Sequence, residues 1–284
     1  MKKEFIMLKD SKSLETCCYV IGAGAFGIFF RWMQLQLAFD NGLPGKSVWH
    51  FFVLLLIAAS AAVFWYFIRK FEKAGLSLSG NFFEALSNGG KVYTVLRWAF
   101  GGILCAGSVL LFMGSELDAN VTFLRVLAGF GLLSGISFPL LLSCANRPHA
   151  VKNSTLTLLA LFPLFLFATW LLTSYKQNSI NPIIWLYAIE VLTLIVDMLA
   201  FFRIAGFAYG VPDAKKTMFN CMLGAMLSLM SLADNRYLGQ QVMFLAVALI
   251  FILVVWIMIA NLAVREKDSE PVADDEEASP VERL

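Results

Sequence analysis

Residues 239–263 read GQQVMFLAVALIFILVVWIMIANLA, a run that contains no charged side chain. A helix needs about 20 apolar residues to cross roughly 30 Å of hydrocarbon, so this run is long enough to span a bilayer. Similar windows precede it along the chain, at residues 17–37, 48–68, 95–114, 122–145, 155–174, 182–205 and 217–233. The sequence therefore predicts an all-α, polytopic helical membrane protein with eight transmembrane helices arranged as four hairpins.

The overall composition points to the same class. Of the 284 residues, 59% are hydrophobic and 15% are charged, and the mean hydropathy is +0.74. Soluble domains are about 45–50% apolar and about 25% charged. This composition excludes a soluble enzyme, a disordered chain and a small disulfide scaffold, and the long continuous runs do not match the roughly 10-residue alternation of barrel strands.

The distribution of basic residues predicts the topology. Most of the 22 lysines and arginines fall in the segments that lie on the same side as both termini, which the positive-inside rule assigns to the cytoplasm. We expect a cytoplasmic N-terminal segment (1–16), a transmembrane domain (17–263) and an acidic, disordered cytoplasmic tail (264–284). The expected location is a plasma membrane of bacterial type. The net charge of +2 is too small to indicate a nucleic-acid partner.

Three charged residues fall inside the predicted spans, namely Arg31, Glu190 and Asp197. A charge at the centre of a membrane helix costs roughly 2.5–3.5 kcal/mol on insertion scales, so such residues are typical of functional sites. Glu190 and Asp197 are close to two helical turns apart and share one face with Tyr187 and Thr193. This polar stripe, together with Arg31 and Gln34, is the predicted substrate or proton pathway.

Helix geometry suggests how these charges pair. At about 1.5 Å per residue, Arg31 and Glu190 lie at matching depth below the outer surface. We therefore expect an Arg31–Glu190 ion pair with Gln34 as a hydrogen-bond partner. Asp197 is expected deeper, without a cation, as a group that exchanges a proton. The alternative is a purely structural polar core that fixes the register of the bundle.

The sequence predicts neither a cofactor nor a metal site. His50 and His149 are expected on opposite sides of the membrane, which excludes a haem held by two histidines. The Gly22–Gly27 stretch matches the G-x-G-x-x-G pattern, but no strand–turn–helix unit surrounds it. We expect close helix packing there, through Ala23 and Gly27. The same packing is predicted for two other pairs of small residues: Gly131 with Gly135, and Gly102 with Ala106.

Two further features lie near the ends of spans. Three arginines (Arg97, Arg125 and Arg203) are expected to reach the lipid headgroups. The stretch NFFEALSN, residues 81–88, is expected either to lie flat in the membrane interface or to form a solvated loop.

The functional hypothesis is a small-molecule or ion transporter, without enzymatic activity, whose polar site includes the predicted pathway residues. The alternative is a non-catalytic membrane anchor or scaffold subunit of a larger complex, and a third hypothesis is a membrane sensor. Besides the lipid bilayer, the expected partners are the transported solute and a cytoplasmic protein that binds the acidic tail.

Overall fold

The computed structural model describes residues 2–40, 43–44, 48–73, 76–77, 81–116, 120–146, 153–178 and 183–264. Eight helices in these ranges are long and apolar enough to cross a membrane, which confirms the all-α, polytopic prediction. They are α1 (Lys2–Leu37), α2 (Val48–Lys73), α4 (Lys91–Gly114), α5 (Val121–Ala145), α6 (Asn153–Asn178), α7 (Ile184–Ala208), α8 (Ala214–Met230) and α9 (Leu238–Ala260). The predicted tail lies outside the described residues from position 265 onward.

The remaining elements are short. Helix α3 covers Phe82–Ala85, and the 3-10 turn η1 (Ser231–Ala233) extends α8. Strands β1 (Phe39–Asp40) and β2 (Leu43–Pro44) pair antiparallel beyond the end of α1. Strands β3 (Leu76–Ser77) and β4 (Ala263–Val264) also pair antiparallel. The second pair joins the α2–α3 connection to the chain just after α9.

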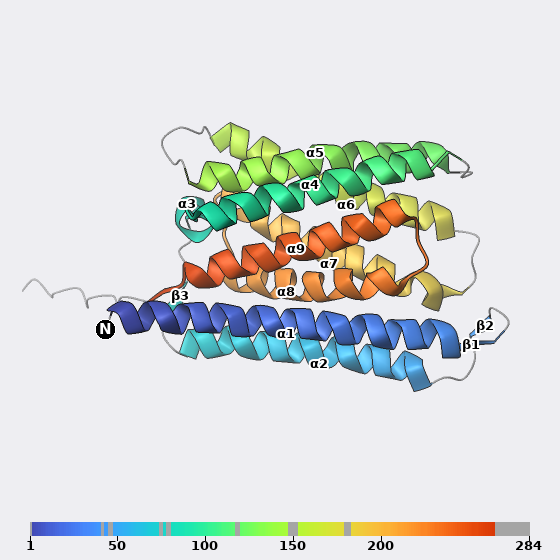
Figure 1. The fold of residues 1–284 in the computed structure, drawn as a ribbon, viewed down its shortest axis with the longest axis horizontal. Coiled ribbons are helices and arrows are strands. Elements are labelled where there is room, and N and C mark those ends of the chain that lie inside the picture. The colour runs from blue at the N-terminus through green and yellow to red at the C-terminus, as the bar shows by residue number, and fades with distance from the viewer. Residues whose placement is uncertain are drawn as a thin grey trace, which may run out of the picture.

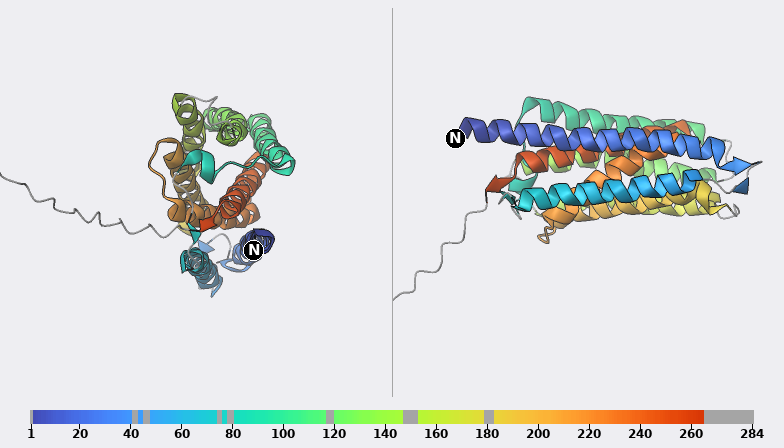
Figure 2. Two further views of the ribbon diagram at one scale, coloured as in Figure 1. Left: turned by 90° about the vertical axis from the view of Figure 1, so that its left-hand side faces the viewer. Right: turned by 90° about the horizontal axis from the view of Figure 1, so that it is seen from below.

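The long helices form a ring with one hairpin attached to it. Consecutive helices from α4 to α9 pack against each other, and α9 returns to α4. The α1–α2 hairpin packs outside this ring, against α8 and α9 (Figures 1 and 2). Because the number of spans is even, both ends of the described chain lie at one end of the bundle, which we call the terminal face. The opposite end, with the α1–α2 and α8–α9 connections, is the far face.

Large aromatic side chains fill the ring. Trp170 lies with its ring centroid 4.4 Å from that of Phe244, and Phe201 lies 5.0 Å from Phe251. Phe167 stacks on Phe201 at 5.3 Å. Interiors packed in this way leave few voids large enough for water, so the centre of the ring is an apolar core.

Small residues bring neighbouring helices close together, as predicted for Gly131 and Gly135. A Cβ atom built at Gly135 would lie 2.5 Å from Cys105 Sγ, so a larger residue would force α4 and α5 apart. The Gly102–Ala106 prediction was wrong, because a Cβ at Gly102 meets nothing within 4 Å whereas one at Gly101 would collide with α5. The spacing of small residues correctly predicted that α4 packs closely against a neighbour, but it did not predict which side of α4 makes the contact.

The segment 81–88 adopts an arrangement that neither sequence hypothesis included. Phe82 and Leu86 are buried, and Figure 2 shows α3 lying across the ring at the terminal face. Asn261 Nδ2 donates to the carbonyl oxygens of Ala85 (2.9 Å) and Ser87 (2.8 Å). The apolar positions of this short helix therefore close the terminal end of the bundle.

Candidate functional site

Arg31 is fully buried in α1 near the far face and donates hydrogen bonds in three directions. Its Nε lies 2.7 Å from Asp234 Oδ1, in the connection between α8 and α9. Its Nη1 donates to Gln34 Oε1 at 2.7 Å and to the Trp185 carbonyl at 3.2 Å. Its Nη2 donates to the Leu186 carbonyl at 2.9 Å. A buried guanidinium is tolerated when its donors are satisfied in this way.

The predicted Arg31–Glu190 ion pair is wrong, because each residue has a different partner. Arg31 pairs with Asp234, and Glu190 Oε2 lies 2.5 Å from Arg236 Nη2. The two pairs are nevertheless close, since Arg31 also donates to the Leu186 carbonyl, about one turn of α7 from Glu190. Matching depth thus placed Arg31 and Glu190 in one region, but each of them pairs with a charge from the α8–α9 turn.

Gln34 extends this cluster to α2. An arginine can only donate, so the oxygen of the Gln34 side chain faces Arg31 and its nitrogen is left to donate to His50 Nδ1, at 2.6 Å. This assignment places the proton of a neutral His50 ring on Nε2, which is buried without a hydrogen-bond partner. The imidazole also stacks on Trp185 with a centroid distance of 4.8 Å.

A polar cavity of about 420 Å³ reaches this cluster from the far face. Its walls include Asp234 and Arg236, each from one of the two ion pairs. Asp234 Oδ2 makes no hydrogen bond, whereas the Glu190 carboxylate contacts Arg236 and lies beside the Ser174 hydroxyl. The cavity is lined by Trp32, Leu35, Gln36, Asn178, Leu186, Ala233, Asp234, Asn235 and Arg236. The cavity wall therefore carries one charge of each sign, Asp234 and Arg236, and their partners Arg31 and Glu190 are buried behind it.

A ladder of polar side chains continues from the cluster toward the middle of the membrane. The Thr193 hydroxyl lies 2.9 Å from the Ser231 hydroxyl and donates to the Ile189 carbonyl at 2.7 Å. The next rung is Ser228, which donates to Asp197 Oδ2 at 2.7 Å. One rung joins α7 to η1 and the other joins α7 to α8, and both are buried. Thr193 and Asp197 of the predicted polar stripe therefore face Ser231 of η1 and Ser228 of α8.

Asp197 is the deepest member of this ladder. It lies about 20 Å along α7 from Ile184, near the middle of the helix, and it is completely buried. Its Oδ1 makes no hydrogen bond and lies against Gly224, where a built Cβ would come within 2.7 Å of it. No lysine or arginine forms an ion pair with Asp197 in the part of the chain that the structure describes.

Tyr187 is half-buried, and within the described ranges no hydrogen bond joins its hydroxyl to the cluster. Five contributors were not predicted from the sequence, namely His50, Ser228, Ser231, Asp234 and Arg236. A signal for the last two exists, because two opposite charges stand close together in the short turn between two strongly apolar helices.

The three arginines expected at the headgroups differ in their surroundings. Arg97 is buried and donates to the Leu142 carbonyl at 3.1 Å, so the expectation was wrong for this residue. Arg125 is exposed and lies over the Phe112 ring. Arg203 is half-buried beside a separate cavity.

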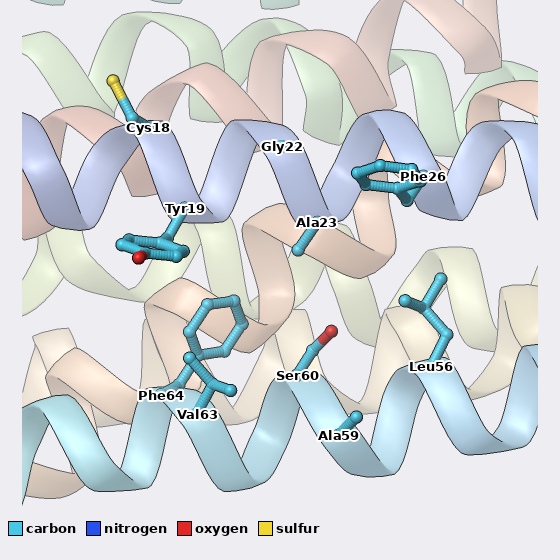
Figure 3. Close-up of a pocket in the computed structure, with 10 residues that line it drawn as sticks. All are labelled: Cys18, Tyr19, Gly22, Ala23, Phe26, Leu56, Ala59, Ser60, Val63 and Phe64. Carbon is cyan, nitrogen blue, oxygen red and sulfur yellow. The ribbon is translucent and has the colours of Figure 1, made fainter.

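An apolar cavity of about 430 Å³ lies between α1 and α2. Figure 3 shows the rings of Tyr19 and Phe64 at one end, Phe26 and Leu56 at the other, and the Ser60 hydroxyl pointing from α2 toward α1. Its ten lining residues carry no charge: Cys18, Tyr19, Gly22, Ala23, Phe26, Leu56, Ala59, Ser60, Val63 and Phe64. The cavity suits an apolar chain or side chain rather than a polar solute.

Comparisons with protein-family models, curated proteins and solved structures find no match to this chain. The geometry of the far-face cluster is therefore the basis for a functional proposal.

Proposed function

We propose that this integral membrane protein is a transporter for a small polar solute, without catalytic activity. The observation that carries the proposal is the far-face cavity, whose walls include one member of each buried ion pair, Asp234 and Arg236. Ion pairs in a membrane interior are costly unless they meet a ligand or hold a structure together. A polar opening beside them favours the first role.

The two ion pairs serve as a gate in this proposal. Arg31 on α1 and Glu190 on α7 are both bound to the α8–α9 turn, through Asp234 and Arg236. The four charges sum to zero, so a solute that carries a carboxylate or an ammonium group can replace one partner without leaving a net buried charge. Such an exchange would loosen the turn from α1 or α7.

In this proposal the described residues form a closed state, and the polar cavity opens at the far face. Aromatic side chains fill the ring, and the α3 segment covers its terminal end. The ladder from Thr193 to Asp197 offers a route for a proton from the far-face cluster to the middle of the bundle. In this proposal Asp197 carries the coupling proton.

The orientation belongs to the proposal as well. The basic residues concentrate toward the terminal face, so we place that face on the cytoplasmic side of a plasma membrane. The far-face cavity then opens to the outside, and the acidic tail is available to a cytoplasmic protein.

A second candidate, a membrane anchor or scaffold, is favoured by two different observations. The ring is filled with aromatic side chains, and the α1–α2 hairpin has an outward apolar cavity lined by small residues such as Gly22 and Ala59. Small residues at a helix surface permit close approach of another helix. In this role the far-face ion pairs only fix the packing of α1.

Solute uptake into proteoliposomes distinguishes the transporter proposal from the anchor proposal. The assay uses labelled amino acids, dicarboxylates, polyamines and inorganic cations, with empty liposomes as the baseline. We expect saturable uptake of at least one solute by the wild-type chain and by the control Arg125→Gln, and a large loss in Arg236→Gln. The double variant Glu190→Gln/Arg236→Gln leaves no buried charge unpaired and should fold but not transport. Asp197→Asn should retain solute binding and lose the accompanying pH change.

An absence of uptake for every solute would overturn the transporter proposal and favour the anchor. Uptake that both Arg236→Gln and the double variant leave unchanged would remove the ion pairs from the mechanism.

A further inference from the structure

A second outward cavity lies between α6 and α7, near the terminal face. Its volume is about 450 Å³, and its walls are mostly apolar, including Leu161 and Leu164 of α6 and Phe202 of α7. Phe202 and Tyr209 are about half exposed, which opens this cavity toward the surrounding bilayer. Its dimensions and lining suit part of an acyl chain.

The turn after α7 shapes one end of this cavity. Gly210 adopts a φ of 77°, and the Val211 amide donates to the Gly206 carbonyl at 2.8 Å, which ends the helix with a left-handed cap. A Cβ at Gly206 would lie 2.8 Å from the Val211 carbonyl oxygen. The two glycines therefore allow the chain to fold tightly over the mouth of the cavity.

Arg203 is the charged residue in the cavity wall. It lies roughly 8 Å before the end of α7, which is close to headgroup level. Its Nε is buried and makes no hydrogen bond, and its guanidinium lies 6.0 Å from the centre of the Phe202 ring. No described acid forms an ion pair with it, in contrast to Arg31 and Arg236. The guanidinium therefore has donor capacity that this chain does not use.

The neighbouring charges determine which headgroup fits. Asp213 acts on Arg203 electrostatically, but its carboxylate is bound to Lys216 at 2.8 Å. Lys215 is likewise bound to Glu72 at 2.6 Å. Among the described charges named here, these pairs leave one uncompensated positive charge, on Arg203. A headgroup with one net negative charge complements it, whereas the amine of a zwitterionic headgroup would find no unpaired acid among these described residues.

We propose that this cavity binds an anionic phospholipid, with the phosphate on Arg203 and one acyl chain between α6 and α7 along Leu161 and Leu164. Arginine pairs with phosphate through two parallel charge-assisted hydrogen bonds. The lipid completes the hydrogen bonding of Arg203 and fills the apolar cavity. This site is independent of solute transport.

Lipid binding to the delipidated full chain tests the proposal. Native mass spectrometry and thermal unfolding are followed while dioleoylphosphatidylglycerol, dioleoylphosphatidylcholine or inorganic phosphate is added. We expect a retained phosphatidylglycerol adduct and a higher melting temperature, a smaller effect of phosphatidylcholine, and none of phosphate. Arg203→Gln should bind phosphatidylglycerol roughly ten-fold more weakly, since it loses the charge-assisted bonds. Arg203→Lys should keep most of the preference, and the exposed far-face control Arg125→Gln should match the wild type.

Leu164→Trp, which fills the cavity and keeps Arg203, should also lose the adduct and provides the test if Arg203→Gln does not fold. Equal binding of the two lipids, or unchanged phosphatidylglycerol binding in the folded variants, would overturn the proposal. Stabilisation by inorganic phosphate equal to that by phosphatidylglycerol would overturn it too, because the ligand would then be a free anion.

Discussion

Arg31 and Asp234 are separated by 203 residues in the chain and form a buried ion pair with a distance of 2.7 Å. The pair joins α1, which packs outside the ring, to the turn between α8 and α9. Since Arg31 also donates to two carbonyl oxygens of α7, a single side chain connects three elements at the far face.

Removing one member of this pair should be costly. Arg31→Gln leaves Asp234, which is 3% exposed, without its cation, and breaking a buried pair in this way costs about 3–5 kcal/mol. The free energy of unfolding in detergent measures the loss. In the double variant Arg31→Gln/Asp234→Asn the effects should be less than additive, with a coupling of about 1–3 kcal/mol. Strictly additive effects would show that the contact contributes nothing.

Gly224 should tolerate no larger residue while Asp197 is present. A Cβ at position 224 would lie 2.7 Å from Asp197 Oδ1 and 3.0 Å from the Phe251 ring. We expect Gly224→Ala to destabilise the protein by about 1–3 kcal/mol, because overpacking outweighs the higher helix propensity of alanine. The matched control is Gly22→Ala, where a Cβ meets nothing within 4 Å.

The combination Asp197→Ala/Gly224→Ala should recover part of the stability that Gly224→Ala loses. Equal melting temperatures for Gly224→Ala and the wild type would contradict the described contact between α7 and α8.

The carboxylate of Asp213, at the start of α8, should make the stability of the protein depend on pH. Partial burial raises the pKa of its carboxyl, but hydrogen bonds from Lys216 and its charge outweigh burial, so the pKa is lowered from its ordinary value. A lowered folded-state pKa stabilises the protein above the unfolded pKa of about 4, and this stabilisation is lost as the pH falls through the folded pKa. At pH 7, Asp213→Ala should cost about 1 kcal/mol through the lost N-cap.

Thermal unfolding at several pH values checks this expectation. The difference between wild type and Asp213→Ala should shrink once the pH falls below about 4. A difference that stays constant down to the lowest pH would count against the role of the carboxylate.

Asn261 should hold the α3 segment over the terminal face. Its side chain donates to two carbonyl oxygens of that segment, and each bond contributes about 0.5–1.5 kcal/mol. Asn261→Ala should therefore accelerate amide hydrogen exchange in residues 82–88. Asn178→Ala, which removes a side-chain hydrogen bond to Ser174 at the other end of the bundle, should leave exchange in that segment unchanged. Equal exchange rates in both variants would contradict the role of Asn261.

The transmembrane helices could be predicted from the sequence because a membrane span requires a minimum length and an apolar composition, and both can be read from the sequence. The run at 239–263 appears as α9 over Leu238–Ala260, with ends displaced by a few residues. The positions of intramembrane charges were informative for the same reason, and Asp197 is indeed buried near the middle of α7. Depth follows directly from residue number in a helix.

Rotation and turn geometry could not be derived in this way. Depth placed Arg31 and Glu190 at one level, but it did not reveal that their partners are Asp234 and Arg236 of the α8–α9 turn. Likewise, the packing position on α4 is Gly101 rather than its neighbour Gly102, a difference of about 100° around the helix. Phe82 is buried because α3 covers the end of the ring, and the pattern of residues along the chain does not predict this tertiary contact.

The most direct test of the central claim is solute uptake by Ala233→Cys, a variant within the far-face cavity, after treatment with a membrane-impermeant maleimide applied from that side. The solute is the one from the uptake panel that the wild type transports. We predict that labelling abolishes uptake by this variant and leaves the wild type and Glu116→Cys, at the exposed α4–α5 connection, unaffected. Full labelling of Ala233→Cys with undiminished uptake would contradict entry through this cavity.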